Sequence, residues 1–401
     1  MPTSLLRPHG PLAAALALLL LATPAAADTT AKAATDVSAR GAAGVSAGAA
    51  AGATAARVPA LVLTAPTGPH PVGTTSLHLV DGSRPDPWVP ERAERELMVS
   101  LWYPARTAHG RRAPYLTERE AELLLREQYI EGIPAEALSR ARTNAVTGAP
   151  PLGRDRSLPL VILSPGSAAP RATLTTLAED LASRGYVVAG IDHTYESSGT
   201  TFPDGRTATC VACRLTDEPG LGQKATRVRA ADASFVLDRL LGPGPAWPGA
   251  RLIDPSRIAM VGHSLGGASA AWTMLTDARV RAGVNLDGAF HLPATGLARP
   301  FLLLGAVRGH RPGGQDPSWG REWPRMTGWK RWLTADGMEH PSFSDFPLIA
   351  ERIGAGGIPA ARAIEITRVY VAAFVDRHLR GRPRPLLAGP SPRYLEVAFW
   401  D

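Results

Sequence analysis

"MVGHSLGGASAA", residues 260–271, sets Ser264 among three glycines, between an apolar run and a helical pattern. Glycine loses more conformational freedom on folding than other residues, so such a concentration needs a structural reason. Residues 262–266 match G-x-S-x-G, a pattern in which the serine occupies a strained turn from a strand into a helix. The pattern predicts that the hydroxyl of Ser264 projects from a sheet edge. The alternative is a glycine packing corner in which the serine is incidental.

Strand-like and helical segments alternate on both sides of this turn. The strand-like segments are nearly continuous apolar runs, as expected of strands buried on both faces. They cover 158–164, 186–192, 257–262, 282–287 and 300–306, and the helical patterns cover 172–185, 225–242, 265–275 and 361–381. This order predicts parallel βαβ units.

Two earlier runs, 75–80 and 96–104, alternate apolar and polar residues in places, as half-exposed antiparallel strands do. The sequence therefore predicts an α/β fold with a mostly parallel, doubly wound sheet and antiparallel N-terminal strands. Such sheets bind ligands at the carboxyl ends of their strands, and Ser264 lies just beyond one such end.

A serine hydroxyl becomes a nucleophile when a histidine takes its proton and an acid orients that histidine. On this kind of fold the partners follow in the order Ser, Asp or Glu, His, which excludes His263 and every earlier histidine. His340, in the loop "TADGMEHPSFSDF", is the predicted base, and His310 is the alternative. His291 lies too close to the best acid candidate, and His378 lies within a helical pattern.

The predicted acid is Asp287, which ends the apolar run "VNLD" and precedes a glycine. The following strand-like run, 300–306, ends without a carboxylate, and the nearest later one is Asp316. The alternative role for Asp287 is to cap its loop. Its position at a strand end makes it the better partner for the histidine.

The oxyanion of an acyl-transfer intermediate needs backbone N–H donors. One predicted donor is the N–H of Leu265, directly after the serine. The second is the N–H of Ser167 in "LSPGSAAPR", residues 163–171, where Gly166 allows close backbone approach. The alternative for this segment is an ordinary strand-to-helix turn rich in turn-forming residues.

The N-terminus has the pattern of an export signal. Arg7 precedes the short apolar run "PLAAALALLLLATP", and small residues allow cleavage after Ala27. Residues 28–57 are almost wholly small and are predicted to form a flexible leader, followed by one catalytic domain over 58–401. We expect a secreted protein, the alternative being an uncleaved N-terminal anchor.

Charge and cysteine content narrow the choice of partners and compartment. The net charge of +7 comes mainly from scattered arginines, so we expect no nucleic-acid binding. Cys210 and Cys213 form a CxxC that could be redox-active or half of a zinc site. No second cysteine pair exists, so a short disulfide in a surface loop is the prediction.

Several segments together resemble plasma-type platelet-activating factor acetylhydrolases and related secreted bacterial lipases and esterases. They are "LWYPA", "VILSPGSAAPRATLTTLAEDLASRGYVVAGIDH", "DPSRIAMVGHSLGGASA", "AGVNLDGAF" and "MEHPSFSDF", in order between residues 101 and 346. The resemblance implies the α/β-hydrolase fold, with Ser264 as nucleophile, Asp287 as acid and His340 as base. It also implies oxyanion donors at Leu265 and Ser167.

One departure concerns the substrate. The animal enzymes commonly have Ser-His-Gly after the oxyanion strand, whereas this chain has Ser-Pro-Gly, residues 164–166, which is more frequent in bacterial polyester and triglyceride hydrolases. We therefore expect a serine hydrolase of carboxylic esters or lipids that works through an acyl-serine, with no metal, cofactor or obligate protein partner. The alternatives are a cutinase-like polyester hydrolase, a peptidase, and a catalytically idle binding protein.

The segment 115–134 combines Leu123, Leu124 and Leu125 with many charged residues on a predicted helix. The commoner interpretation is a helix that packs its apolar stripe on the core. The alternative is a lid that makes transient contact with a lipid interface.

Overall fold

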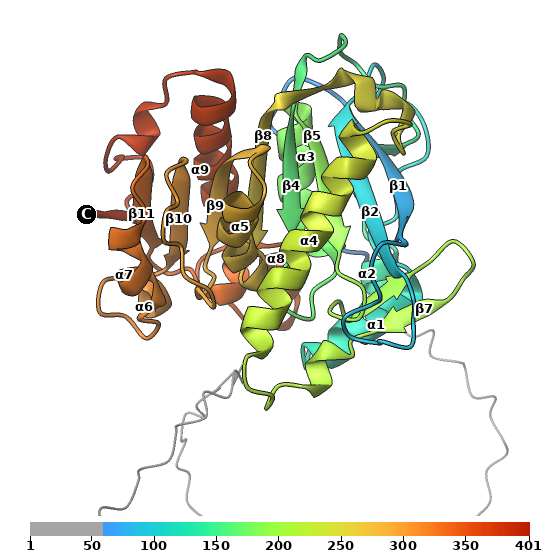
Figure 1. Cartoon of the computed structure of the whole chain (residues 1–401), viewed down its shortest axis with the longest axis horizontal. Coiled ribbons are helices and arrows are strands. Elements are labelled where there is room, and N and C mark those ends of the chain that lie inside the picture. Colours follow the sequence, from blue (N-terminus) through green and yellow to red (C-terminus); the bar gives the residue numbers. More distant parts are fainter. Residues whose placement is uncertain (1–58) are drawn as a thin grey trace, which may run out of the picture. The chain divides into compact units, whose positions relative to one another are not determined.

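The computed structural model describes residues 59–401, so the predicted export signal and leader lie outside the described residues. A ten-stranded sheet runs through this part of the chain in the order β12-β11-β10-β9-β8-β4-β5-β2-β1-β3 (Figure 1). Neighbouring strands are parallel from β11 to β5, whereas β2 pairs antiparallel with β5 and β1, and β12 pairs antiparallel with β11. The predicted α/β-hydrolase fold is confirmed.

The strands of this sheet are β1 (Val72–Asp81), β2 (Arg95–Pro104), β3 (Val146–Thr147), β4 (Leu158–Ser164), β5 (Val187–Asp192), β8 (Ile253–His263), β9 (Val280–Leu286), β10 (Phe301–Ala306), β11 (Lys330–Ala335) and β12 (Val397–Trp400). A separate hairpin joins β6 (Gly199–Thr201) and β7 (Thr207–Thr209). The α-helices are α1 (Glu118–Glu127), α2 (Ala135–Ser139), α3 (Thr175–Ser183), α4 (Leu221–Leu241), α5 (Leu265–Thr276), α6 (Val307–His310), α7 (Ser318–Glu322), α8 (Phe346–Ala350) and α9 (Ala360–Arg380).

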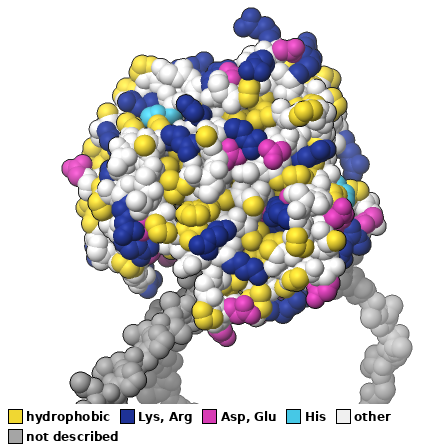
Figure 2. Space-filling view, in the orientation of Figure 1, with side chains coloured by type: hydrophobic (Ala, Val, Ile, Leu, Met, Phe, Trp, Pro, Cys, Tyr) yellow, Lys and Arg dark blue, Asp and Glu magenta, His cyan; other side chains and the backbone are white. Residues whose placement is uncertain are grey.

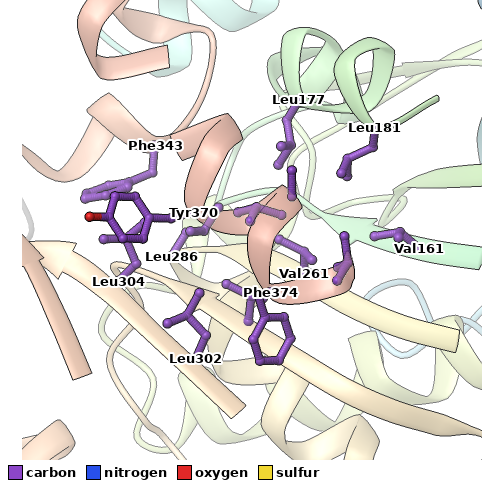
Figure 3. Packing of buried hydrophobic residues seen from close by; sticks show 14 of the residues in the cluster. Val161, Leu177, Leu181, Val261, Leu286, Leu302, Leu304, Phe343, Tyr370 and Phe374 are labelled. Atoms are coloured by element: carbon purple, nitrogen blue, oxygen red, sulfur yellow. The ribbon is translucent and has the colours of Figure 1, made fainter. Parts of the chain in front are cut away.

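Helices cover both faces of the sheet, with α4 and α5 on one face and α3 and α9 on the other (Figure 1). Successive side chains of a strand point to opposite faces, so each inner strand contributes to two cores. In β4, Val161 and Leu163 pack toward α3 and α9, whereas Leu160 and Ile162 pack toward α4 and α5. Figure 3 shows the first of these cores. The continuous apolar runs in the sequence follow from this two-sided burial.

The register of the parallel strands brings their carboxyl ends to one level. Ser164 at the end of β4 lies opposite Gly262 in β8, and Gly262 lies opposite Asn285 in β9. The loops that follow β4, β8, β9, β10 and β11 therefore start along one edge of the sheet. All the predicted catalytic residues belong to these loops.

The prediction missed β11 and β12 at one edge of the sheet and the two-residue strand β3 at the other. β11 begins with Lys330 and Arg331, which shortens its apolar run, and β12 has only four residues at the end of the chain. Such edge strands carry little periodicity because their pairing depends on distant segments. The predicted helix over 172–185 divides into a 3₁₀ turn, Arg171–Leu174, and α3.

The leucines of α1 are buried, as the commoner interpretation of this segment predicts. Leu123 and Leu124 are completely buried and Leu125 is 7% exposed, so these side chains are not available to a lipid interface. Tyr129, just beyond the helix, is 89% exposed. In this structure α1 packs its leucines into the protein, and the lid stays an untested alternative.

Cys210 and Cys213 form a disulfide between β7 and a 3₁₀ turn, Ala212–Arg214. Figure 2 shows basic side chains mixed with acidic and apolar ones on the visible face. Within residues 59–401, no helix has the length and apolar character needed to span a membrane.

Substituting Gly266 by alanine tests the close packing around the turn at Ser264. A Cβ at Gly266 would lie 2.0 Å from the carbonyl oxygen of Ser164. We expect Gly266→Ala to lower the free energy of unfolding by about 1–3 kcal/mol, because the backbone must shift to admit a methyl group. Urea denaturation followed by circular dichroism measures the change.

Gly320→Ala is the matched control, because no atom lies within 4 Å of a Cβ built at this helical position. Its stability should equal or slightly exceed that of the unchanged chain. Equal stability of the two variants would contradict the packing argument.

Candidate active site

Ser264 occupies the strained turn that the glycine pattern predicts. Its φ is +54° and its ψ is −125°, between the end of β8 and the start of α5. A Cβ at Gly262 would lie 2.1 Å from the backbone of Gly266, and a Cβ at Gly267 would lie 2.1 Å from Oδ1 of Asn285. The small residues thus let the strand, the turn and the helix approach closely, and they leave the side chain of Ser264 half-buried at the sheet edge.

His340 joins Ser264 to Asp287. Its Nδ1 lies 2.7 Å from Oδ2 of Asp287, and its Nε2 lies 2.9 Å from Oγ of Ser264. Because the carboxylate only accepts hydrogen bonds, Nδ1–H donates to it, and Nε2 of the neutral ring accepts from the hydroxyl. The structure therefore brings together the three residues that the sequence predicted, in the order required for nucleophilic catalysis.

Hydrogen bonds from α3 and from Tyr115 anchor the loop that carries His340. Asp345 is completely buried, and its carboxylate accepts hydrogen bonds from the backbone N–H and hydroxyl of Thr176 in α3 and from the hydroxyl of Tyr115. Burial raises the pKa of Asp345 to about 7. These contacts hold the 3₁₀ turn that begins at His340.

His263 supports the same loop. Its Nε2–H donates to the carbonyl oxygen of His340 at 2.8 Å. Burial, and next the neighbouring His340, lower the pKa of His263 to about 3, so this ring stays neutral in the folded protein. This geometry agrees with the prediction that His263 is not the base.

His310, the alternative base, contacts the acid instead of the serine. Its Nδ1 lies 2.8 Å from Oδ1 of Asp287, and its Nε2 lies 2.9 Å from Oδ2 of Asp316. Asp316, the nearest carboxylate after the run 300–306, contacts Asp287 through this ring. His310 and Asp316 therefore lie behind the Asp287–His340 pair, away from the hydroxyl of Ser264.

The electrostatics of this cluster favour an ionised Asp287. Burial alone would raise the pKa of Asp287, but hydrogen bonds from His310 and His340 outweigh it and hold the pKa well below its usual range. Burial alone would lower the pKa of His310, but its two carboxylate partners raise that pKa to about 9.

The segment after β4 lies directly beside the serine. A Cβ at Gly166 would lie 3.4 Å from Cβ of Ser264. The completely buried guanidinium of Arg229 donates to the carbonyl oxygens of Pro165, at 2.5 Å, and Gly166, at 3.3 Å. In a trans peptide the C=O and the following N–H point in opposite directions, so the N–H of Ser167 points away from Arg229.

The first residue of α5 supplies a second N–H at the same place. The N–H of Leu265 belongs to the first turn of the helix, where backbone donors have no partner within the helix. Both predicted oxyanion donors thus belong to segments next to Ser264. Arg229, in α4, was not predicted, because no local pattern links it to a loop more than 60 residues earlier.

A second Ser–His–Asp set lies deeper in the protein and was also not predicted. His193 contacts Oγ of Ser164 at 2.9 Å through Nε2 and Oδ2 of Asp232 at 2.8 Å through Nδ1. All three side chains are at most 1% exposed, so no substrate can reach this hydroxyl. Arg95 pairs with Asp232 at 2.8 Å, which makes the set part of a buried ion network.

A cavity of about 540 Å³ is lined in part by Phe290, which follows Asp287 by three residues in the chain. Its wall runs from Phe290 to Pro293 and continues through α7 and the start of α4. The lining is mixed apolar and polar, and it includes His291, Gln223 and Arg321.

Lowering the pH from 7 to 5 should destabilise the protein by about 2 kcal/mol through His263 alone. The unfolded chain binds a proton at this histidine below its ordinary pKa of 6.5, whereas the folded state excludes the proton until about pH 3. Stability therefore falls as the pH falls through this window. Urea denaturation at both pH values measures the loss.

His263→Gln, which keeps a side-chain N–H donor, should lose less stability between these two pH values. His109→Gln, at an exposed position, is the control. An equal loss in the unchanged chain and in His263→Gln would show that His263 does not cause the pH dependence.

Similarity to known proteins agrees with the fold. Residues 56–209 and 250–380 match the family described as platelet-activating factor acetylhydrolase, isoform II. A probable 1-alkyl-2-acetylglycerophosphocholine esterase of Arthroderma benhamiae is 30% identical over 86% of this chain and 96% of its own length. The platelet-activating factor acetylhydrolase of Gallus gallus is 25% identical over 79% of this chain and 83% of its own length.

A solved structure extends this similarity to three dimensions. The ferulic acid esterase from Streptomyces cinnamoneus is 46% identical, with a TM-score of 0.76 over 85% of this chain and 99% of its own length. The predicted resemblance is confirmed: the chain belongs to the platelet-activating factor acetylhydrolase isoform II family and is an ester hydrolase with the α/β-hydrolase fold.

Proposed function

We propose that this ester hydrolase uses Ser264 as its nucleophile and works through an acyl-serine intermediate. His340 takes the proton from Oγ as it attacks the ester carbonyl carbon, and the N–H groups of Leu265 and Ser167 bind the oxyanion. The intermediate collapses when His340 returns the proton to the leaving alcohol. Water then attacks the acyl-serine with His340 again as base, and free acid and Ser264 are released.

One observation carries this mechanism: His340 bonds Asp287 and Ser264 at once, at 2.7 and 2.9 Å, while Ser264 stands at the sheet edge. A second Ser–His–Asp set in the same protein supports this mechanism by contrast. Ser164, His193 and Asp232 have nearly the same contacts, but they are buried and open to no substrate. The two sets differ in whether a substrate can reach the serine hydroxyl.

Two classes of ester are the candidate substrates. The A. benhamiae relative favours glycerophosphocholines with a short acyl group, which we propose first. The 46% identity to a ferulic acid esterase favours aromatic hydroxycinnamate esters as the second candidate. These relatives favour neither a polyester hydrolase nor an idle binding protein.

We further propose that the protein is secreted, on the strength of the apolar run before Ala27. The proposal predicts that protein recovered from the culture medium begins at Asp28. An uncleaved N-terminus retained with the cells would contradict it, and N-terminal mass analysis decides between the two.

Ser264→Ala should lower kcat by at least about 10⁴-fold and abolish labelling by a fluorophosphonate, because within residues 59–401 no other accessible serine hydroxyl contacts a histidine. Ser164→Ala is the matched control and should still be labelled, since its hydroxyl is inaccessible. Labelling that persists in Ser264→Ala would contradict the proposed nucleophile.

The substrate class is tested by comparing kcat/KM for two pairs of esters. The first pair is an acetylated glycerophosphocholine and the same lipid with a long acyl chain. The second pair is methyl ferulate and a non-aromatic methyl ester. A preference for the acetylated phospholipid supports the first candidate. A preference for the ferulate overturns it in favour of the second.

A further inference from the structure

His310 is held between two carboxylates behind the proposed active site. It ends α6, directly after β10, and only 5% of it is exposed. Each ring nitrogen contacts a carboxylate oxygen, Nδ1 that of Asp287 at 2.8 Å and Nε2 that of Asp316 at 2.9 Å. The proposed mechanism gives neither His310 nor Asp316 a task.

The hydrogen-bond partners determine the charge of this ring. Asp287 also accepts from the N–H of Ala306, at 2.6 Å, and from His340, and Asp316 accepts from the N–H and the hydroxyl of Ser318, both at 2.8 Å. Both carboxyl groups are therefore acceptors in every contact described. Both nitrogens of His310 must donate, which only the imidazolium form can do.

Neighbouring residues pack closely around Asp287 and His310. A Cβ at Gly305 in β10 would lie 2.7 Å from Oδ1 of Asp287 and 3.0 Å from Cβ of His310. The ring of Trp319 lies 4.1 Å from that of His310, centroid to centroid. From β11, the indole N–H of Trp332 donates to the backbone carbonyl of His310 at 2.7 Å.

Two further titratable groups act on the cluster. His340 lies across Asp287, and His291 interacts electrostatically with Asp316. His310 is thus the cation between two anions, with one more histidine beyond each of them.

We propose, on the basis of the proposed serine mechanism, that His310 is a positioning residue. As an imidazolium it fixes the rotation of the Asp287 carboxylate toward His340, and it partly neutralises that carboxylate. A weaker negative field holds a proton on His340 less tightly. The base is then free to accept the proton of Ser264 at a lower pH than Asp287 alone would permit.

The charges beside His340 predict how a change at His310 shifts the pH dependence of kcat/KM. Asp287, Asp316 and the charged His310 sum to −1, whereas a neutral residue at position 310 leaves −2 beside His340. His310→Gln should move the acidic limb of the kcat/KM profile upward by about 1 pH unit, because the protonated base is better stabilised. Adding Asp316→Asn returns the sum to −1 and should move the limb back down.

A merely structural role for His310 would lower activity without this reversible shift. His378→Gln is the matched control, since it replaces a half-buried histidine in α9, remote from the site. The profile of His378→Gln should keep its acidic limb. An unshifted limb in folded His310→Gln, or one that Asp316→Asn fails to bring back, overturns the proposal.

A measurement on the unchanged protein covers a variant that fails to fold. Heteronuclear NMR of the ring nitrogens should show both nitrogens of His310 protonated near neutral pH, and a neutral tautomer overturns the proposal. Fluorophosphonate labelling separates this outcome from failure of the serine mechanism. His310→Gln should still be labelled at Ser264, whereas loss of labelling in the unchanged protein would refute the mechanism itself.

Discussion

The site depends on one buried charge, the carboxylate of Asp287. A carboxylate removed from water is strongly destabilised unless donors surround it. Asp287 is 3% exposed and takes hydrogen bonds from the N–H of Ala306 and from the rings of His310 and His340. Three separate loops after β9, β10 and β11 must converge for this charge to be tolerated. Their convergence places His340 against Ser264.

Buried ion pairs organise the opposite wall of the site in the same manner. Arg229 holds two carbonyl groups of the loop after β4 while its Nε–H donates to Glu196 at 2.7 Å. Breaking one partner of such a pair leaves an uncompensated charge, so the geometry of the loop is strongly defined. The N–H of Ser167 is therefore oriented before substrate arrives, as the proposed stabilisation of an oxyanion requires.

The two Ser–His–Asp sets show that residue identity and contact distance do not by themselves make an active site. Ser164 and Ser264 each lie 2.9 Å from a histidine that bonds an aspartate. Ser264 stands on a turn with a positive φ at the sheet edge, whereas Ser164 is the buried last residue of strand β4. Backbone conformation thus separates an accessible hydroxyl from a buried one.

Local sequence determined much of this protein. The glycines around Ser264, the continuous apolar runs of the inner strands and the order of Ser264, Asp287 and His340 all follow from short-range patterns, because a sharp turn and two-sided burial constrain adjacent residues. The edge strands and the positions of His310, Asp316 and Arg229 left no such pattern. They depend on pairing and charge compensation between segments far apart in the chain, and only the tertiary structure decided them.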